Sequence, residues 1–234
     1  MLTIQNLTKH YKGSDKGVTG LDLEIEAGDI YGFIGHNGAG KTTTIKCITG
    51  IQDFDEGEIW IDGLSVKKDA MACKERTAYI PDNPDLYEYM TGIQYLNFIS
   101  DIFRVSATER GERIETYADA FEITSSYSHG MKQKLAILSA LVHKPKLLIL
   151  DEPFVGLDPK ASLVLKDIMR NLCAEGGSIF FSTHVLEVAE KLCNKVAIIK
   201  DGRLVAAGRM EDVVAKGGSL ESTFMGVAVN GQTD

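Results

Sequence analysis

The chain has 234 residues, of which 44% are hydrophobic and 25% are charged. These fractions are typical of a soluble globular protein, and they exclude a disordered or collagen-like chain. The formal net charge is −8, which argues against a broad nucleic-acid-binding face because such a face needs an excess of basic residues.

The first 30 residues show alternating hydrophobicity. Apolar and polar residues alternate at 2–7 and again at 21–26, and a polar, Gly-rich turn at 12–17 separates the two runs. This pattern predicts antiparallel strands with one face in water, and therefore an N-terminal antiparallel β subdomain. An apolar run at 30–34 predicts a buried strand, and a Gly-rich turn after it leads into a predicted helix at 41–49.

The middle of the chain has a different pattern. Residues 86–142 are predicted to be mostly helical, because apolar residues such as Tyr95, Phe98 and Ile102 fall on one helical face. We therefore expect a helical insert between two parts of an α/β domain.

Strands and helices alternate again after Pro145. Strands are predicted at 147–150, 178–182, 195–200 and 203–207, and helices at 160–174 and 185–193. Short apolar strands separated by helices predict an α/β fold, in which helices cover a parallel sheet on both faces. We expect residues 1–225 to form a single domain and residues 226–234 to form a flexible tail.

The cysteine pattern and the hydropathy argue against two other classes of protein. The four cysteines are Cys47, Cys73, Cys173 and Cys193. They form no C-x-x-C pair, so neither a zinc site nor a disulfide framework is expected. No window approaches the ~18 consecutive apolar residues that a membrane span needs, and the N-terminus does not resemble a signal peptide. We therefore expect a cytoplasmic chain that does not cross a bilayer by itself.

Residues 35–42 read GHNGAGKT and fit the phosphate-loop pattern G-x-x-x-x-G-K-[ST]. The motif lies between a predicted strand and a predicted helix, which disfavours the alternative of an ordinary Gly-rich turn. Its glycines let the backbone N–H groups point at phosphate oxygens, and the helix adds the positive end of its dipole. Lys41 is expected to reach the β- and γ-phosphates, and the Thr42 hydroxyl to bind Mg²⁺. The predicted nucleotide-binding residues of this loop are Asn37, Gly38, Ala39, Gly40, Lys41, Thr42 and Thr43.

Two acidic residues, Asp151 and Glu152, follow the predicted strand at 147–150. Ligands of open α/β sheets bind beyond the carboxyl ends of the strands, so both carboxylates should face the same crevice as Thr42. We expect Asp151 to hold Mg²⁺ and Glu152 to activate the attacking water as a general base. Without the phosphate loop, such a pair would more often begin a solvated loop.

Further motifs follow downstream in a fixed order. Residues 127–135 read YSHGMKQKL, residues 156–159 read GLDP, and His184 follows an apolar run. Together with the phosphate loop, these segments resemble the signature loop, the D-loop and the switch histidine of the ATP-binding cassette (ABC) family of transporter ATPases. Tyr11 lies where that family has an aromatic residue that stacks on adenine. The resemblance covers nearly the full length of the chain.

The resemblance implies a P-loop NTPase core and a head-to-tail homodimer with two ATP molecules between its subunits. Ser128 and Gly130 would bind the nucleotide held by the phosphate loop of the partner copy, and His184 would hold the γ-phosphate. The helical insert would contact a separate integral-membrane permease, which places the chain at the inner face of the cell membrane. The family branch implied is bacterial and exporter-type. An ordinary helix N-cap remains the alternative for Ser128, an ordinary core or turn aromatic for Tyr11, and an ordinary core or surface histidine for His184.

The sequence departs from the family pattern at three positions. Asp82 stands where a Gln is usual, His129 replaces a Gly, and Met131 replaces a Gln. A carboxylate at position 82 could bind Mg²⁺ but would repel the γ-phosphate. We hypothesise that Asp82 still links the nucleotide state to the partner-facing helices. Unchanged hydrolysis and unchanged stimulation by the partner in an Asp82→Ala variant would exclude that role.

Two other functions are compatible with the sequence. The chain could be an ABC-type switch acting on a soluble assembly, although it has neither a long coiled-coil insert nor a second phosphate loop. It could also be a regulatory nucleotide-binding module that hydrolyses ATP weakly, because Asp82 and His129 alter family positions. A GTPase is excluded by the absence of a guanine-reading N-K-x-D motif, and the acidic charge argues against a nucleic-acid partner.

Overall fold

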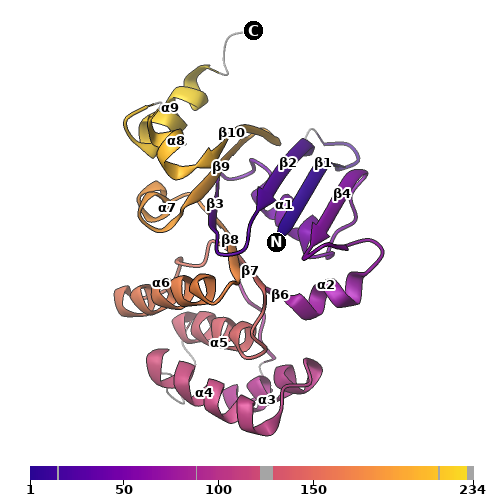
Figure 1. The fold of residues 1–234 in the computed structure, drawn as a ribbon, viewed down its shortest axis with the longest axis vertical. Helices are drawn as coiled ribbons and strands as arrows, with labels where there is room; N and C mark the ends of the chain where they lie inside the picture. The colour runs from indigo at the N-terminus through magenta and orange to yellow at the C-terminus, as the bar shows by residue number, and fades with distance from the viewer. Residues whose placement is uncertain (15, 88, 122–128, 216, 231–234) are drawn as a thin grey trace.

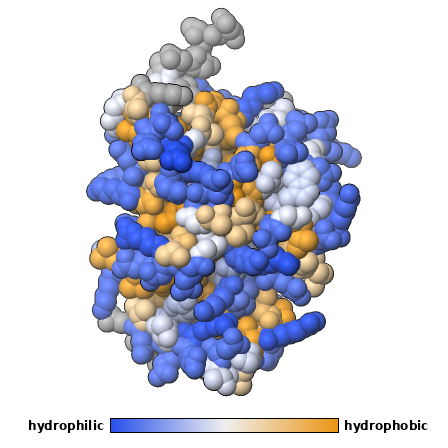
Figure 2. All heavy atoms as spheres, in the orientation of Figure 1, coloured by the Kyte–Doolittle hydropathy of each residue, from blue (hydrophilic) through white to orange (hydrophobic). Residues whose placement is uncertain are grey.

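The computed structural model describes residues 1–234 except 15, 88, 122–128, 216 and 231–234. Two β-sheets and a group of helices make up the described part (Figure 1). The antiparallel sheet lies at the upper right of the view, the helical insert at the bottom, and the last two helices at the upper left. Figure 2 shows mostly hydrophilic residues on this face, with smaller apolar groups among them.

The smaller sheet is antiparallel, as the alternating N-terminal segment predicts, and its strand order is β2-β1-β4-β5. Its strands are β1 (Leu2–His10), β2 (Gly17–Ile25), β4 (Glu56–Ile61) and β5 (Leu64–Ser65). The central strand β1 pairs with both β2 and β4, and register shifts interrupt both pairings near its middle. Sequence analysis found β1 and β2 but did not assign β4 or β5.

The larger sheet has six strands in the order β10-β9-β3-β8-β7-β6. They are β3 (Ile30–Ile34), β6 (Thr77–Ile80), β7 (Leu147–Asp151), β8 (Ser178–Thr183), β9 (Lys195–Lys200) and β10 (Arg203–Arg209). All neighbours pair in parallel except β10, which pairs antiparallel with β9 across the turn at Asp201 and Gly202. The predicted parallel sheet is therefore confirmed, with an antiparallel strand at one edge.

Alternate residues of the central strands pack into two different cores. Ile179 and Phe181 of β8 belong to a core with the helices α6 (Pro159–Ala174) and α7 (Leu186–Leu192). Phe180, between them, belongs to a second core that includes the smaller sheet and α1 (Lys41–Ile48). Because both faces are covered, the strands are apolar throughout rather than alternating.

The helical insert comprises α3 (Gly92–Ile102), α4 (Ala107–Phe121) and α5 (His129–Leu141). Thr91 caps α3: its hydroxyl accepts the Gln94 N–H, and the Gln94 side chain accepts the Thr91 N–H. At the base of the insert, the rings of Phe103 and His143 stack with centroids 3.7 Å apart. The predicted insert is thus present, and it rejoins the large sheet at β7.

Three more helices complete the described fold: α2 (Ala70–Arg76), α8 (Met210–Ala215) and α9 (Leu220–Asn230). Residues 226–230, which were expected to belong to a flexible tail, are part of α9. All four cysteines are buried and unpaired. Within the described ranges, no helix has the length and apolarity needed to cross a bilayer.

Candidate functional site

A pocket of about 410 Å³ lies at the carboxyl end of the large sheet, beside the N-terminus of α1. Parts of the chain that are far apart in sequence meet there: the β1–β2 turn, the phosphate loop, and the segments that follow β6 and β7. The residues lining it are Tyr11, Ser14, Lys16, Gly17, His36, Asn37, Gly38, Gly40, Lys41, Thr42, Thr43, Asp82, Asp151 and Glu152. The structure therefore brings together nearly all of the predicted phosphate-loop residues and both predicted carboxylates.

The backbone of the phosphate loop requires glycine. A Cβ at position 35 would lie 2.6 Å from the Ile199 carbonyl oxygen, and one at position 40 would lie 2.7 Å from Val18 Cγ1. Gly40 also has a φ of 111°, in the region that side chains other than glycine avoid, and it is the N-cap of α1. The loop is thus held tightly where the helix begins, with the free N–H groups of α1 at the pocket.

Lys41 is buried, and its ammonium group bridges the loop. Its Nζ donates to the Gly35 carbonyl at 2.6 Å and lies 3.5 Å from Glu152 Oε1. Glu152 Oε1 is buried and accepts no hydrogen bond from any described residue. Apart from this ion pair, the oxygen keeps its hydrogen-bonding capacity for a ligand or a water, which a buried carboxylate oxygen normally satisfies.

Thr42 and Asp151 form the candidate metal site. The Thr42 hydroxyl donates to Asp151 Oδ2 at 2.8 Å, and the Ser182 hydroxyl donates to Asp151 Oδ1. Hydroxyl and carboxylate oxygens are the ligands that Mg²⁺ prefers, and few protein ligands suffice because the ion keeps several waters. Thr42 and Asp151 therefore fit Mg²⁺, and Asp82 contributes another carboxylate to the lining of the same pocket.

Glu152 is held in an unusual conformation between β7 and β8. Its φ is 49°, in the left-handed region, and its N–H lies 3.1 Å from the Ser182 hydroxyl oxygen and 3.2 Å from the Ser182 carbonyl oxygen. Its other carboxylate oxygen, Oε2, lies 3.0 Å from His184 Nδ1. Strained backbone of this kind concentrates at functional sites. His184 thus meets Glu152, although it is not among the residues lining the pocket.

Tyr11 follows β1 directly and lines the same pocket as the carboxylates. Its hydroxyl donates to Gln52 Oε1 at 2.9 Å and lies 3.3 Å from Thr43 Oγ1. These contacts orient the ring, and 37% of the residue remains exposed. Burial raises the pKa of Tyr79 on β6, and the charges of Asp151 and Asp82 raise it further.

The structure describes only part of the predicted signature segment. Ser128 lies outside the described residues, whereas Gly130 is in the first turn of α5. Lys134, further along α5, forms an ion pair of 2.9 Å with Asp158. Asp158 also caps α6 by accepting the Ala161 N–H, which lowers the pKa of its carboxyl group, and the hydrogen bond with Lys134 lowers it further. This pair connects the helical insert to the loop after β7.

Sequence analysis missed three kinds of residue near the site. Ser182 was not a candidate because its contacts depend on the β7–β8 register, which pairs it with Asp151. Ser14 and Lys16 line the pocket from the β1–β2 turn, and only their polarity in a Gly-rich turn could have suggested them. His36 was part of the motif, but the pattern gives its position no role.

Comparisons with known proteins identify the family. The family model for ABC transporters matches residues 18–155. The ABC transporter ATP-binding protein YhaQ of Bacillus subtilis is 36% identical over 231 residues, which cover 96% of this chain and 76% of YhaQ. The chain belongs to the ABC transporter family. The family that the sequence motifs predict is thereby confirmed.

Solved structures of ABC proteins share the fold. The structure of an ATP-binding subunit of an ABC transporter is 32% identical, with a TM-score of 0.91, and the match covers 97% of this chain and 99% of that one. CbiO1 of Clostridium perfringens, part of the ABC transporter complex CbiONQ, is 26% identical with a TM-score of 0.77, over 92% of this chain and 90% of CbiO1. The predicted α/β fold with its antiparallel β subdomain is confirmed.

Proposed function

We propose that this chain is the ATP-binding and ATP-hydrolysing subunit of an ABC transporter that drives transport through a separate permease. The observation that carries the proposal is the cluster around Glu152. Its carboxylate lies between the buried ammonium of Lys41 and the imidazole of His184, and one of its buried oxygens has no hydrogen-bond partner among the described residues. A general base next to a phosphate-binding lysine is the arrangement that nucleotide hydrolysis needs.

Each residue of the pocket has a role in this proposal. The phosphate loop binds the phosphates through its N–H groups and Lys41, and Tyr11 stacks on adenine from the exposed side. Glu152 accepts a proton from the attacking water, and His184 orients the Glu152 carboxylate and the γ-phosphate. Thr42 and Asp151, with Asp82, hold Mg²⁺, which when bound neutralises charge on the phosphate oxygens.

The exposed surface supports a membrane partner. Tyr87, Tyr89 and Phe98 project from α3 and the segment before it, and Tyr89 is 79% exposed. Their rings lie against one another, with centroids 5.6 Å apart for Tyr87 and Tyr89 and 5.8 Å for Tyr87 and Phe98. An exposed aromatic group is typical of a surface that binds another protein. Its place on the helical insert favours a permease as the partner, as does the likeness to CbiO1, which is part of a transporter complex.

The proposal includes a head-to-tail homodimer with ATP between the copies. In this arrangement the start of α5 in one copy, with Gly130, would contact the nucleotide held by the phosphate loop of the other copy. ATP would close the pair, and hydrolysis would let it reopen. The bacterial exporter-type branch stays a prediction from the motifs.

Hydrolysis by the purified chain tests the proposal. We expect ATP-dependent phosphate release that requires Mg²⁺ and is lost in a Lys41→Ala variant, which removes the phosphate-binding ammonium group. ATP binding without any phosphate release would favour a regulatory nucleotide-binding module instead.

A second assay separates a transporter subunit from a switch on a soluble assembly. Affinity purification from membranes of the native host should recover a protein with several apolar spans of about 20 residues each. Recovery of a soluble assembly alone would contradict the transporter role. A Tyr89→Ala variant should recover less of the permease, whereas a Leu163→Ala variant, altered at an exposed apolar position on α6, should recover as much as the wild type.

A further inference from the structure

The C-terminal helix contacts the phosphate loop. The ring of Phe224 on α9 lies against the ring of His36, with centroids 4.7 Å apart and planes inclined at 56°. His36 is exposed and lines the nucleotide pocket, whereas Phe224 is half-buried and packs against the core on the α6–α7 side of the large sheet. A residue near the end of the chain therefore contacts a residue of the predicted nucleotide site.

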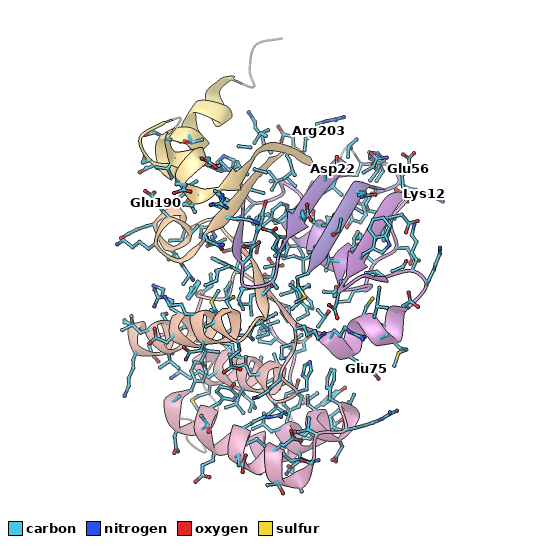
Figure 3. All side chains as sticks on the ribbon, in the orientation of Figure 1. Lys12, Asp22, Glu56, Glu75, Glu190 and Arg203 are labelled. Carbon is cyan, nitrogen blue, oxygen red and sulfur yellow. The ribbon has the colours of Figure 1, made fainter. Side chains whose placement is uncertain are left out.

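Phe224 does not lie on a loosely attached segment. Leu220, one turn earlier on α9, is fully buried in the same core. The Leu220 N–H donates to Glu190 Oε2 of α7 at 3.2 Å, and Thr223 Oγ1 donates to the Val213 carbonyl of α8 at 3.1 Å. Glu190 is labelled in Figure 3, beside α8 and α9. The start of α9 is thus fixed on two neighbouring helices, so Phe224 can act as a rigid support.

The backbone of His36 takes part in the phosphate loop. Its carbonyl oxygen accepts the Ala39 N–H at 3.1 Å and lies 3.4 Å from Lys41 Nζ. Because the His36 ring and carbonyl belong to the same residue, a support on the ring restricts the position of the carbonyl. The contact with Phe224 therefore acts on the hydrogen bonds that shape the loop around Lys41.

We propose that Phe224 is a positioning residue for the nucleotide site. From α9, its ring holds His36 and so keeps the first half of the phosphate loop in the conformation that receives ATP. This inference rests on the proposed function, in which ATP binds in that loop. Aromatic pairs are worth more than the area they bury, so loss of this contact should weaken ATP binding about three- to tenfold.

The test measures the dissociation constant of a fluorescent ATP analogue for the wild type, Phe224→Leu, His36→Ala and the double variant. Leucine keeps the apolar contact of position 224 with the core but removes the ring. We expect Phe224→Leu to bind the analogue about three- to tenfold more weakly. Met225→Ala, next to it on α9 and 56% exposed, is the matched control and should bind as the wild type does.

The double variant separates positioning from a purely structural role. If Phe224 acts through His36, the effects do not add, and the double variant should bind no more weakly than His36→Ala alone. Effects that multiply, or a Phe224→Leu variant that binds like Met225→Ala, would overturn the inference. Thermal melts without nucleotide show whether each variant is folded.

Failure of this inference can be told apart from failure of the proposed function. A wild type that does not bind the analogue would contradict both. Multiplying effects, or a Phe224→Leu variant that binds like Met225→Ala, would contradict the inference alone.

Discussion

At the scale of single residues, Ser182 connects the two carboxylates of the site. Its hydroxyl donates to Asp151 and lies 3.1 Å from the Glu152 N–H, and the residue is fully buried on β8. One hydroxyl group therefore orients the proposed Mg²⁺ ligand and supports the left-handed backbone of the proposed base. Hydrogen bonds to charged groups contribute more than neutral ones, about 1.5–3 kcal/mol each.

A Ser182→Ala variant should therefore lower kcat about 10- to 100-fold, in line with the loss of one such hydrogen bond. It should also raise the Mg²⁺ concentration needed for half-maximal activity, because Asp151 loses a donor that orients it. Ser182→Thr is the matched control, since it keeps the hydroxyl and suits a β-strand. Equal losses in both variants would show that the packing of position 182, and not its hydroxyl, is what matters.

Sequence analysis predicted the residues that a local motif defines and missed those that depend on the fold. Lys41 and Thr42 were found because the chemistry of the phosphate loop is confined to eight consecutive residues. Ser182 could not be found, because its pairing with Asp151 is set by the register between β7 and β8. His36 was visible in the motif, but its contact with Phe224 depends on where the C-terminal helix packs.

At the scale of elements, the base of the helical insert contains a histidine that the fold keeps neutral. The pKa of His143 is lowered to about 4, chiefly by burial and also by the nearby charge of Arg113, whereas a backbone hydrogen bond at Thr77 opposes the shift. Both ring nitrogens are buried, and the ring stacks on Phe103 at the end of α3. The junction between the insert and the large sheet is therefore built for an uncharged imidazole.

This junction predicts how stability depends on pH. In the unfolded chain His143 has its ordinary pKa of about 6.5, so between pH 6.5 and 4 the unfolded state binds a proton that the folded state does not. The free energy of unfolding should therefore fall as the pH drops through this window, by about 2 kcal/mol at pH 5 from this group.

Urea denaturation from pH 7 to pH 4.5 measures this effect. A His143→Phe variant keeps a ring against Phe103 but cannot take up a proton, so its stability should fall less steeply over the same range. Because the other titrating groups are common to both proteins, the difference between the two curves isolates His143. Parallel curves would mean that His143 binds its proton as well in the folded state as in the unfolded state, which would contradict this prediction.

The elements themselves were predicted where periodicity is strong. The parallel strands β3, β7, β8 and β9 and helix α6 were found, since apolar runs and helical spacing mark them clearly, whereas the parallel strand β6 was not assigned. Strands β4 and β5 were not assigned, and their place beside β1 is a long-range pairing that no local pattern reports. The extent of α9 was not predicted, because the glycine and valines after residue 225 disfavour helix, whereas the packing of Leu220 and Phe224 against the core is a tertiary contact.

At the scale of the whole molecule, the site exists only when both sheets and the loops between them are assembled. Tyr11 comes from the end of β1, Lys41 from α1, Asp151 from β7 and His184 from the segment after β8. The insert approaches the same region through the ion pair between Lys134 of α5 and Asp158. This ion pair connects the insert to the segment that follows Glu152, and in the proposed function it is a contact through which movement of the insert could reach the site.

The most direct test of the account is the rate of phosphate release by a Glu152→Gln variant at saturating ATP and Mg²⁺. The amide keeps the shape of the side chain but cannot accept a proton from water, so turnover should fall at least about 100-fold. The affinity for ATP, measured on the same preparation, should stay within a few-fold of the wild type, because Lys41 and the phosphate loop are unchanged. Turnover close to that of the wild type would contradict the assignment of Glu152 as the base.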